Sequence, residues 1–128
     1  MITRSEAIIP ITPTADTTGR EGFFILPTGA LVSSATAAAP LGVITEGDVT
    51  TKKTSVATPN FGGTVKVKLA ATPGTIINGS YLVLDGTTQA TAKLDPGTGS
   101  RIRVARALEP GVANELIEAY LVEPAILA

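Results

Sequence analysis

The chain has 128 residues, and its ten Lys and Arg against eleven Asp and Glu give a net charge of −1 at pH 7. This length suits a single domain with a core of its own, and the balanced charge excludes the basic field that non-specific nucleic-acid binding requires. The sequence contains no His and no Cys, which excludes Ser-His-Asp and Cys-His catalysis, zinc sites and disulfides. We therefore expect no cofactor and no metal.

The proportions of charged and aromatic residues exclude further classes of protein. Charged residues make up 16% of the chain, below the roughly 25% of ordinary soluble domains, so we expect partners to cover part of the surface. Trp is absent and aromatic residues are 4%, which removes the stacking platforms that sugars and single-stranded nucleic acid need. No apolar run approaches the roughly 20 residues that span a bilayer. Glu6 and Pro10 interrupt the segment where an export signal would lie, so we expect a soluble, unexported protein.

Residues 1–20 are predicted to form an extended arm. They hold an apolar cluster, Ile8, Ile9 and Ile11, which Pro10 and Pro13 interrupt. Because proline has no N–H to donate to a sheet ladder, this segment does not suit a central strand. It is interpreted as an arm that docks on another molecule or, alternatively, as an edge strand of the domain itself.

Gly, Pro and Thr punctuate the following residues about every eight to twelve positions, as is typical of an all-β chain. The small residues 33–39 are predicted to form an exposed loop, because Pro40 would end a helix there at once. The predicted strands of this half are residues 22–27, 30–32, 40–45 and 54–57.

The clearest alternation lies in residues 64–71, where Val65, Val67 and Leu69 share one face. Two hairpin signals follow, at residues 78–79 (Asn-Gly) and 85–86 (Asp-Gly). Residues 64–92 are therefore predicted to form three meandering strands, the second over 80–84 and the third over 87–92.

Residues 101–109 alternate as a further strand, with Arg101 and Arg103 outward and Ile102 and Val104 inward. Strict alternation would turn Arg106 into the core, where an unpaired charge is expensive. The sequence favours a bulge or edge exposure at this point. The alternative is that Arg106 reaches a buried carboxylate or a contact between subunits.

The last segment, residues 112–122, fits two structures. Its apolar positions match one face of a helix as well as a strand, but it is short and lies in all-β surroundings. We favour a closing strand.

The residues that could carry chemistry are not arranged for catalysis. Glu46 and Asp48 flank Gly47 in a predicted turn, and such a turn usually holds solvated charges. Asp95 begins an Asp-Pro-Gly sequence that is explained as a turn. Arg101, Arg103 and Arg106 form the densest basic cluster and could pair with acids on a partner. We expect a binding protein and not an enzyme.

Several short motifs follow one another along the chain after the N-terminal arm. They are residues 40–48 (Pro-Leu-Gly-Val-Ile-Thr-Glu-Gly-Asp), 63–69 (Gly-Thr-Val-Lys-Val-Lys-Leu), 79–84 (Gly-Ser-Tyr-Leu-Val-Leu), 104–109 (Val-Ala-Arg-Ala-Leu-Glu) and 115–121 (Glu-Leu-Ile-Glu-Ala-Tyr-Leu). Their order resembles the capsid cement, or head decoration, proteins of tailed bacteriophages, over roughly residues 20 to 122. Arg106 departs from the resemblance, since a small or apolar residue often stands at that place in the family.

The resemblance implies a structural protein that binds as a homotrimer to the outer surface of the mature capsid, with the major capsid protein as its partner. The protein would be made in the host cytoplasm and end on the virion. Ile8, Ile9 and Ile11 are the candidate capsid contacts, and Arg106 is a candidate contact between subunits. The alternatives are another structural β-module of a virion (a tail, spike or adhesin component), a small-ligand carrier barrel or an enzyme.

The predicted fold is thus an all-β, small single-domain β-barrel or sandwich-like fold of about eight to nine short strands. Residues 1–20 are assigned to the extended N-terminal arm and residues 21–128 to a β-barrel-like decoration domain.

Overall fold

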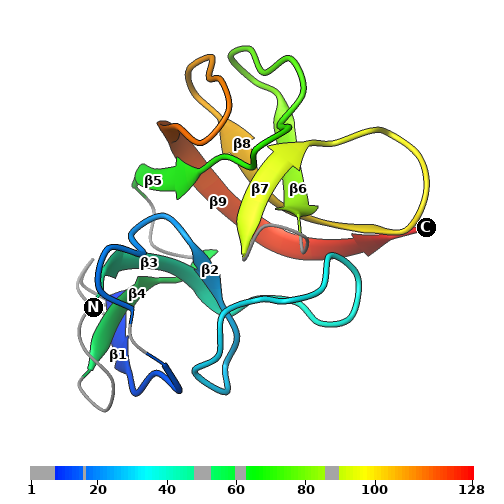
Figure 1. Ribbon diagram of the computed structural model, residues 1–128. Coiled ribbons are helices and arrows are strands. Elements are labelled where there is room, and N and C mark those ends of the chain that lie inside the picture. The colour runs from blue at the N-terminus through cyan, green and yellow to red at the C-terminus, as the bar shows by residue number, and fades with distance from the viewer. Residues whose placement is uncertain (1–7, 16, 48–52, 60–62, 86–89) are drawn as a thin grey trace, which may run out of the picture.

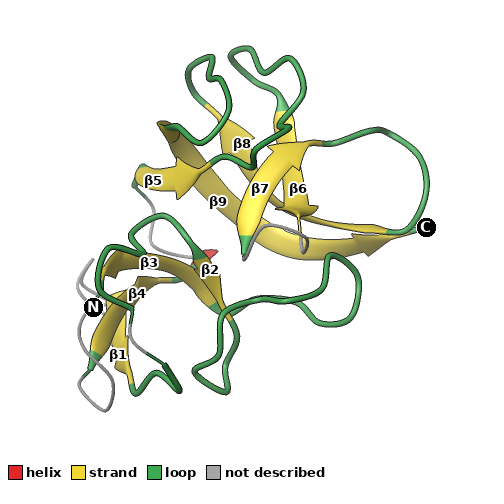
Figure 2. Cartoon of the chain, viewed as in Figure 1, coloured by secondary structure: helices red, strands yellow, loops and turns green. Residues whose placement is uncertain are grey.

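The structure, a computed structural model, describes residues 8–15, 17–47, 53–59, 63–85 and 90–128. Within these ranges the chain forms nine β-strands, whose arrangement Figures 1 and 2 show, and the residues described include no α-helix. The strands are β1 (Ile8–Ile11), β2 (Phe24–Ile25), β3 (Gly42–Glu46), β4 (Thr54–Ala57), β5 (Val65–Lys68), β6 (Tyr81–Asp85), β7 (Thr91–Leu94), β8 (Arg101–Ala107) and β9 (Leu116–Leu127).

The first four strands form an antiparallel sheet in the order β1-β4-β3-β2, here called the N-terminal sheet. β3 and β4 approach closely at Gly42, where a Cβ atom would overlap the carbonyl oxygen of Ala57. Only glycine fits at this point of the sheet.

The other five strands form the C-terminal sheet, in the order β5-β9-β8-β6-β7. This sheet curls until its two edges nearly meet. Leu69 and Ala92 form a parallel bridge between the ends of β5 and β7, and the Ala70 amide donates to the Ala92 carbonyl at 2.8 Å. The result is a small, nearly closed barrel (Figure 1), which leaves little unpaired edge.

A single apolar core joins the two sheets. Gly22, two residues before β2, lies at the junction of the two sheets. Its amide donates to the Ile44 carbonyl of β3 at 2.8 Å, and its carbonyl accepts from the Lys68 amide of β5 at 3.0 Å. The largest fully buried side chains come from both sheets, namely Phe24, Ile25, Ile44, Leu69, Leu82, Leu84, Ile102 and Ile117.

The all-β fold class is confirmed, and β4 coincides with the predicted strand over residues 54–57. Residues 33–39 lie outside the strands, as predicted. The strand predicted over 22–27 is reduced to β2, and of residues 30–32 only Leu31 pairs, in an isolated bridge with Ile25.

The predicted meander over residues 64–92 is wrong in its first half. β5 pairs with β9 and not with β6. The residue pair 78–79 does make a turn, in which the Ser80 amide donates to the Ile77 carbonyl at 3.1 Å, but this turn belongs to a long loop before β6. A turn sequence reverses the chain locally but does not determine which strand pairs with β5. That pairing depends on which apolar face is buried in the core.

The second half of the meander is confirmed, with β6 and β7 paired from Leu82↔Leu94 to Asp85↔Thr91. The third strand begins later than predicted, at Thr91. Of the predicted turn at 85–86, residue 86 lies outside the described residues.

β8 carries the predicted bulge. Leu82 of β6 pairs with Ala105, but Val83 pairs with Arg103, so β8 has one extra residue there. Val104 and Ala105 are consecutive and both buried in the core. This shift of phase turns Arg106 to the outer face, where Arg103 also lies. The closing strand over residues 112–122 is confirmed as well, as the first half of β9.

The N-terminal segment follows the second of its two interpretations where it is described. Ile8–Ile11 form β1, the edge strand of the N-terminal sheet, from Ile8↔Ala57 to Ile11↔Thr54. Ile8, Ile9 and Ile11 are half-buried and pack against the core. Pro10 leaves this edge without one N–H, which weakens it as a template for another strand. Residues 1–7 lie outside the described residues.

Candidate binding surface

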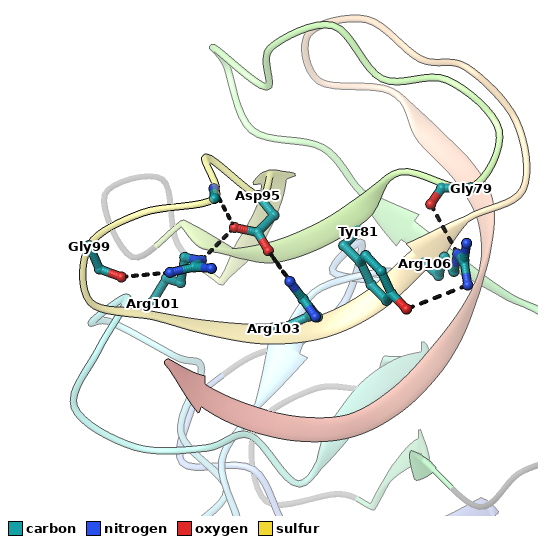
Figure 3. Close-up of polar contacts among 8 residues, drawn as sticks. Gly79, Tyr81, Asp95, Gly99, Arg101, Arg103 and Arg106 are labelled. Carbon is teal, nitrogen blue, oxygen red and sulfur yellow. Dashed lines mark hydrogen bonds and ion pairs between the residues drawn. The ribbon is translucent and has the colours of Figure 1, made fainter. Parts of the chain in front are cut away.

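The most organised polar cluster is centred on Asp95, just after β7. Its Oδ1 accepts hydrogen bonds from the Gly97 amide at 2.9 Å and from Arg101 Nε at 2.5 Å. Its Oδ2 accepts from Arg103, at 3.1 Å from Nε and 2.7 Å from Nη2 (Figure 3). The Asp95 side chain is 7% exposed, so the two ion pairs are largely shielded from water.

The pKa of Asp95 reflects this environment. Desolvation by burial acts to raise the pKa, but the hydrogen bonds from the Gly97 amide, Arg103 and Arg101 together outweigh it. The pKa of Asp95 therefore lies below its usual value of 3.8, and the carboxylate is charged at neutral pH.

Tyr81 of β6 extends the cluster along the outer face of the C-terminal sheet. Its ring lies between two guanidinium groups (Figure 3), with the Cζ atoms of Arg103 and Arg106 at 4.0 Å and 4.7 Å from the ring centroid. Arg106 is also anchored by its Nε, which donates to the Gly79 carbonyl at 3.0 Å, and by a long contact of 3.5 Å from Nη1 to the Tyr81 hydroxyl.

Tyr120 completes this surface. Arg106 pairs with Tyr81 on β6 and with Tyr120 on β9, and residues directly opposite each other on neighbouring strands share a face. We call the set Tyr81, Arg103, Arg106 and Tyr120 the arginine–tyrosine face. It contains both tyrosines of the chain.

Beside it, Glu118 of β9 is engaged by Lys66 of β5 at 3.2 Å. Hydrogen bonds from Lys66 and Thr64 lower the pKa of Glu118. The Glu118 carboxylate therefore forms an ion pair between the neighbouring strands β5 and β9.

A second surface lies at one end of the barrel. The bridge between Ile76 and Gly111 holds the β5–β6 loop and the β8–β9 loop side by side, at the top of Figure 1. These loops expose Ile77 (62%), Leu108 (40%) and Val112 (65%). We call these three residues the apolar tip.

The predicted site residues do not meet in one place. Ile8, Ile9 and Ile11 belong to the N-terminal sheet, whereas Arg106 belongs to the outer face of the C-terminal sheet. Glu46 is exposed at the end of β3, and its predicted neighbour Asp48 lies outside the described residues.

Sequence reasoning missed the role of Asp95, which was explained by its turn alone. The signal was the pair of arginines on one strand face six and eight positions later, because two outward charges at that spacing can share one carboxylate. Arg101 and Arg103 do lie on the outer face, but they are held by Asp95 and are only 11% and 28% exposed.

The described ranges contain no group of three or more His, Cys, Asp or Glu that could hold a metal ion. Among the same residues, no helix is long and apolar enough to cross a membrane.

No protein-family model matches the chain, and no curated protein is significantly similar to it in sequence. The resemblance to phage decoration proteins therefore rests on the order of the short motifs alone.

Proposed function

We propose that this chain is a structural protein of the capsid decoration type, which binds as a homotrimer to the outer surface of the mature capsid of a tailed phage and stabilises it. The observation that carries the proposal is the apolar tip. Isolated exposed apolar residues are ordinary, but Ile77 and Val112 lie on two loops that are bridged to each other and are both more than half exposed. Exposed apolar side chains that gather in one place are typical of binding surfaces.

The placement of the resembling motifs supports the same proposal. Residues 40–48 contain β3, 63–69 contain β5, 79–84 reach through most of β6, and 104–109 and 115–121 cover the end of β8 and the start of β9. Each motif therefore contains all or part of a strand, namely β3, β5, β6, β8 or β9.

Such a protein acts by mass action. A protein that binds the expanded shell and not the unexpanded one shifts the equilibrium toward the expanded state. Many identical contacts on one shell add their effects, so each of them can be weak. The apolar tip is proposed as the main contact with the major capsid protein. Ile8, Ile9 and Ile11 remain candidate contacts through the open edge of β1, and Arg106 remains a candidate contact between subunits.

The test combines light scattering after size-exclusion chromatography with co-sedimentation on empty tailed-phage shells in the expanded and unexpanded forms. We expect a trimer that pellets with expanded shells only. A monomer that does not pellet with either form would overturn the proposal and favour another structural β-module of the virion.

The variant Ile77→Ser with Val112→Ser tests the contact itself. Because both side chains are exposed, we expect unchanged thermal stability and about tenfold weaker pelleting. The matched control is Ile126→Ser, which removes an equally exposed side chain (70%) from β9, away from both loops. Equal loss of pelleting in both variants would contradict a role for the tip.

A further inference from the structure

We infer that the arginine–tyrosine face binds the carboxylate groups of an acidic segment in a partner protein. This inference concerns a different surface from the apolar tip and does not depend on the capsid contact proposed there. It competes with the contact between subunits proposed for Arg106, and the experiment below distinguishes the two.

The first argument is charge. Three arginines bring positive charge to this part of the molecule, namely Arg101, Arg103 and Arg106. Asp95 pairs with the first two, whereas Arg106 contacts no carboxylate among the described residues. Nearby, Lys66 lies 3.2 Å from Glu118 and 4.0 Å from Glu109. Counted together, four cations stand against three carboxylates here. The face is therefore left with an excess of positive charge in a chain whose net charge is −1, and an acidic partner complements it.

The second argument is the set of donors that the fold leaves available. Arg103 uses Nε and Nη2 on Asp95, and Arg106 uses Nε on Gly79 and Nη1 on Tyr81. Within the described residues, Arg103 Nη1 and Arg106 Nη2 have no hydrogen-bond partner. A guanidinium N–H with no acceptor in the chain is suited to a carboxylate oxygen from outside.

The third argument is preorganisation. Both guanidinium groups are already held, one by Asp95 and the other by the Gly79 carbonyl, and both lie against the ring of Tyr81 (Figure 3). A partner would not need to order these long side chains, which is a main cost of binding through arginine. Arg and Tyr are also the residue types that contribute most to protein interfaces.

The shape of the surface favours a chain segment over a small anion. The face runs across three neighbouring strands, from Tyr81 on β6 through Arg106 on β8 to Tyr120 on β9. A peptide that carries acidic residues can lie along such a surface.

The experiment titrates the full chain with poly-L-glutamate at low ionic strength and follows its tyrosine fluorescence, with poly-L-lysine as the comparison. Both tyrosines lie on the face and the chain has no Trp, so the emission reports this surface directly. We expect poly-L-glutamate alone to change the emission, in a saturable way that added salt weakens.

The variant Arg106→Gln removes one charge and one available donor from the face, and we expect it to weaken the binding of poly-L-glutamate about tenfold. Lys53→Gln is the matched control, because it removes the same charge from an exposed position beside the N-terminal sheet, where Lys53 Nζ donates to Thr12. Thermal melts of both variants establish that they are folded.

Three results would overturn the inference: wild-type chain that does not respond to poly-L-glutamate, equal weakening by the two variants, or an Arg106→Gln variant that changes the mass of the assembly and not the titration. The last result would assign the face to a contact between copies of this chain. The first two results do not bear on sedimentation with shells, so the capsid proposal is judged separately. The third would support the proposed contact between subunits at Arg106.

Discussion

Asp95 is the residue on which the start of β8 depends. Its carboxylate joins the loop at Gly97 to Arg101 and Arg103, and it is almost fully shielded from water. Hydrogen bonds to charged groups contribute more to stability than neutral ones, and leaving a shielded charge without its partner is costly. Asp95 therefore acts as a clamp between the end of β7 and the start of β8.

We predict that Asp95→Asn lowers the free energy of unfolding by about 2 kcal/mol at neutral pH. The loss arises because an amide accepts less well than a carboxylate and places its NH₂ group against a guanidinium. Urea unfolding measures the effect. Glu46→Gln, at an exposed position on β3, should change the same quantity by less than about 0.5 kcal/mol.

The pH dependence of this difference follows from the lowered pKa. The charge of Asp95 stabilises the fold fully above its unfolded-state pKa, near 3.8, and the stabilisation is lost as the pH falls through the lower folded-state pKa. The gap between wild type and Asp95→Asn should therefore be constant above about pH 5 and shrink as the pH falls through 3.8 and below it. A gap that stays constant would mean that the carboxylate charge is not the source of the effect.

Among the elements, Gly22 decides how β2 meets the barrel. It has a φ of +89°, and an added Cβ would overlap Cδ2 of Leu116 and lie 2.9 Å from the Lys68 amide nitrogen. The close approach lets the backbone of Gly22 bond to both sheets. Any side chain at this position would push β2 away from the edge of β5.

We predict that Gly22→Ala lowers the free energy of unfolding by about 3 kcal/mol or more. Gly19→Ala is the matched control, since Gly19 also has a positive φ, +76°, but has open space where the Cβ would be. This control should cost about 1 kcal/mol, from backbone strain alone. Denaturant unfolding measures the loss of unfolding free energy in both variants, and the difference between them is the steric cost at Gly22. Equal losses of unfolding free energy would contradict the close packing.

At the scale of the whole molecule, the two sheets share one core. Buried side chains of both sheets belong to a single cluster, and the Phe24 amide of β2 donates to the Ala90 carbonyl just before β7, at 2.9 Å. Neither sheet buries its apolar face without the other, so the chain should unfold as one cooperative unit.

We predict that far-ultraviolet circular dichroism and tyrosine fluorescence report the same unfolding transition. The comparison is informative because both tyrosines lie in the C-terminal sheet, whereas circular dichroism reports both sheets. Phe24 lies in the N-terminal sheet and is 1% exposed. We expect Phe24→Ala to lower the free energy of unfolding by about 3 to 5 kcal/mol, equally by both signals. Thr36→Ala, in an exposed loop, should leave both transition midpoints unchanged. If Phe24→Ala did not shift the midpoint of the fluorescence transition, the two sheets would be independent folding units.

The amino-acid sequence by itself determined the local structure. Three features could be predicted from neighbouring residues alone: the alternation of residues 64–71, the strand over 54–57 and the phase break at Arg106. This is possible because side chains along any strand alternate between its two faces. The resemblance to decoration proteins and the roles it implies remain predictions.

Tertiary structure alone decided which strands lie side by side. β5 pairs with β9, some fifty residues away, and Asp95 and Tyr81 become the centre of a surface because β6, β7 and β8 are brought together. Many pairings satisfy the same alternation, and the choice among them depends on which one buries both sheets in one core. That choice depends on the packing of the whole chain, which no short segment of the sequence contains.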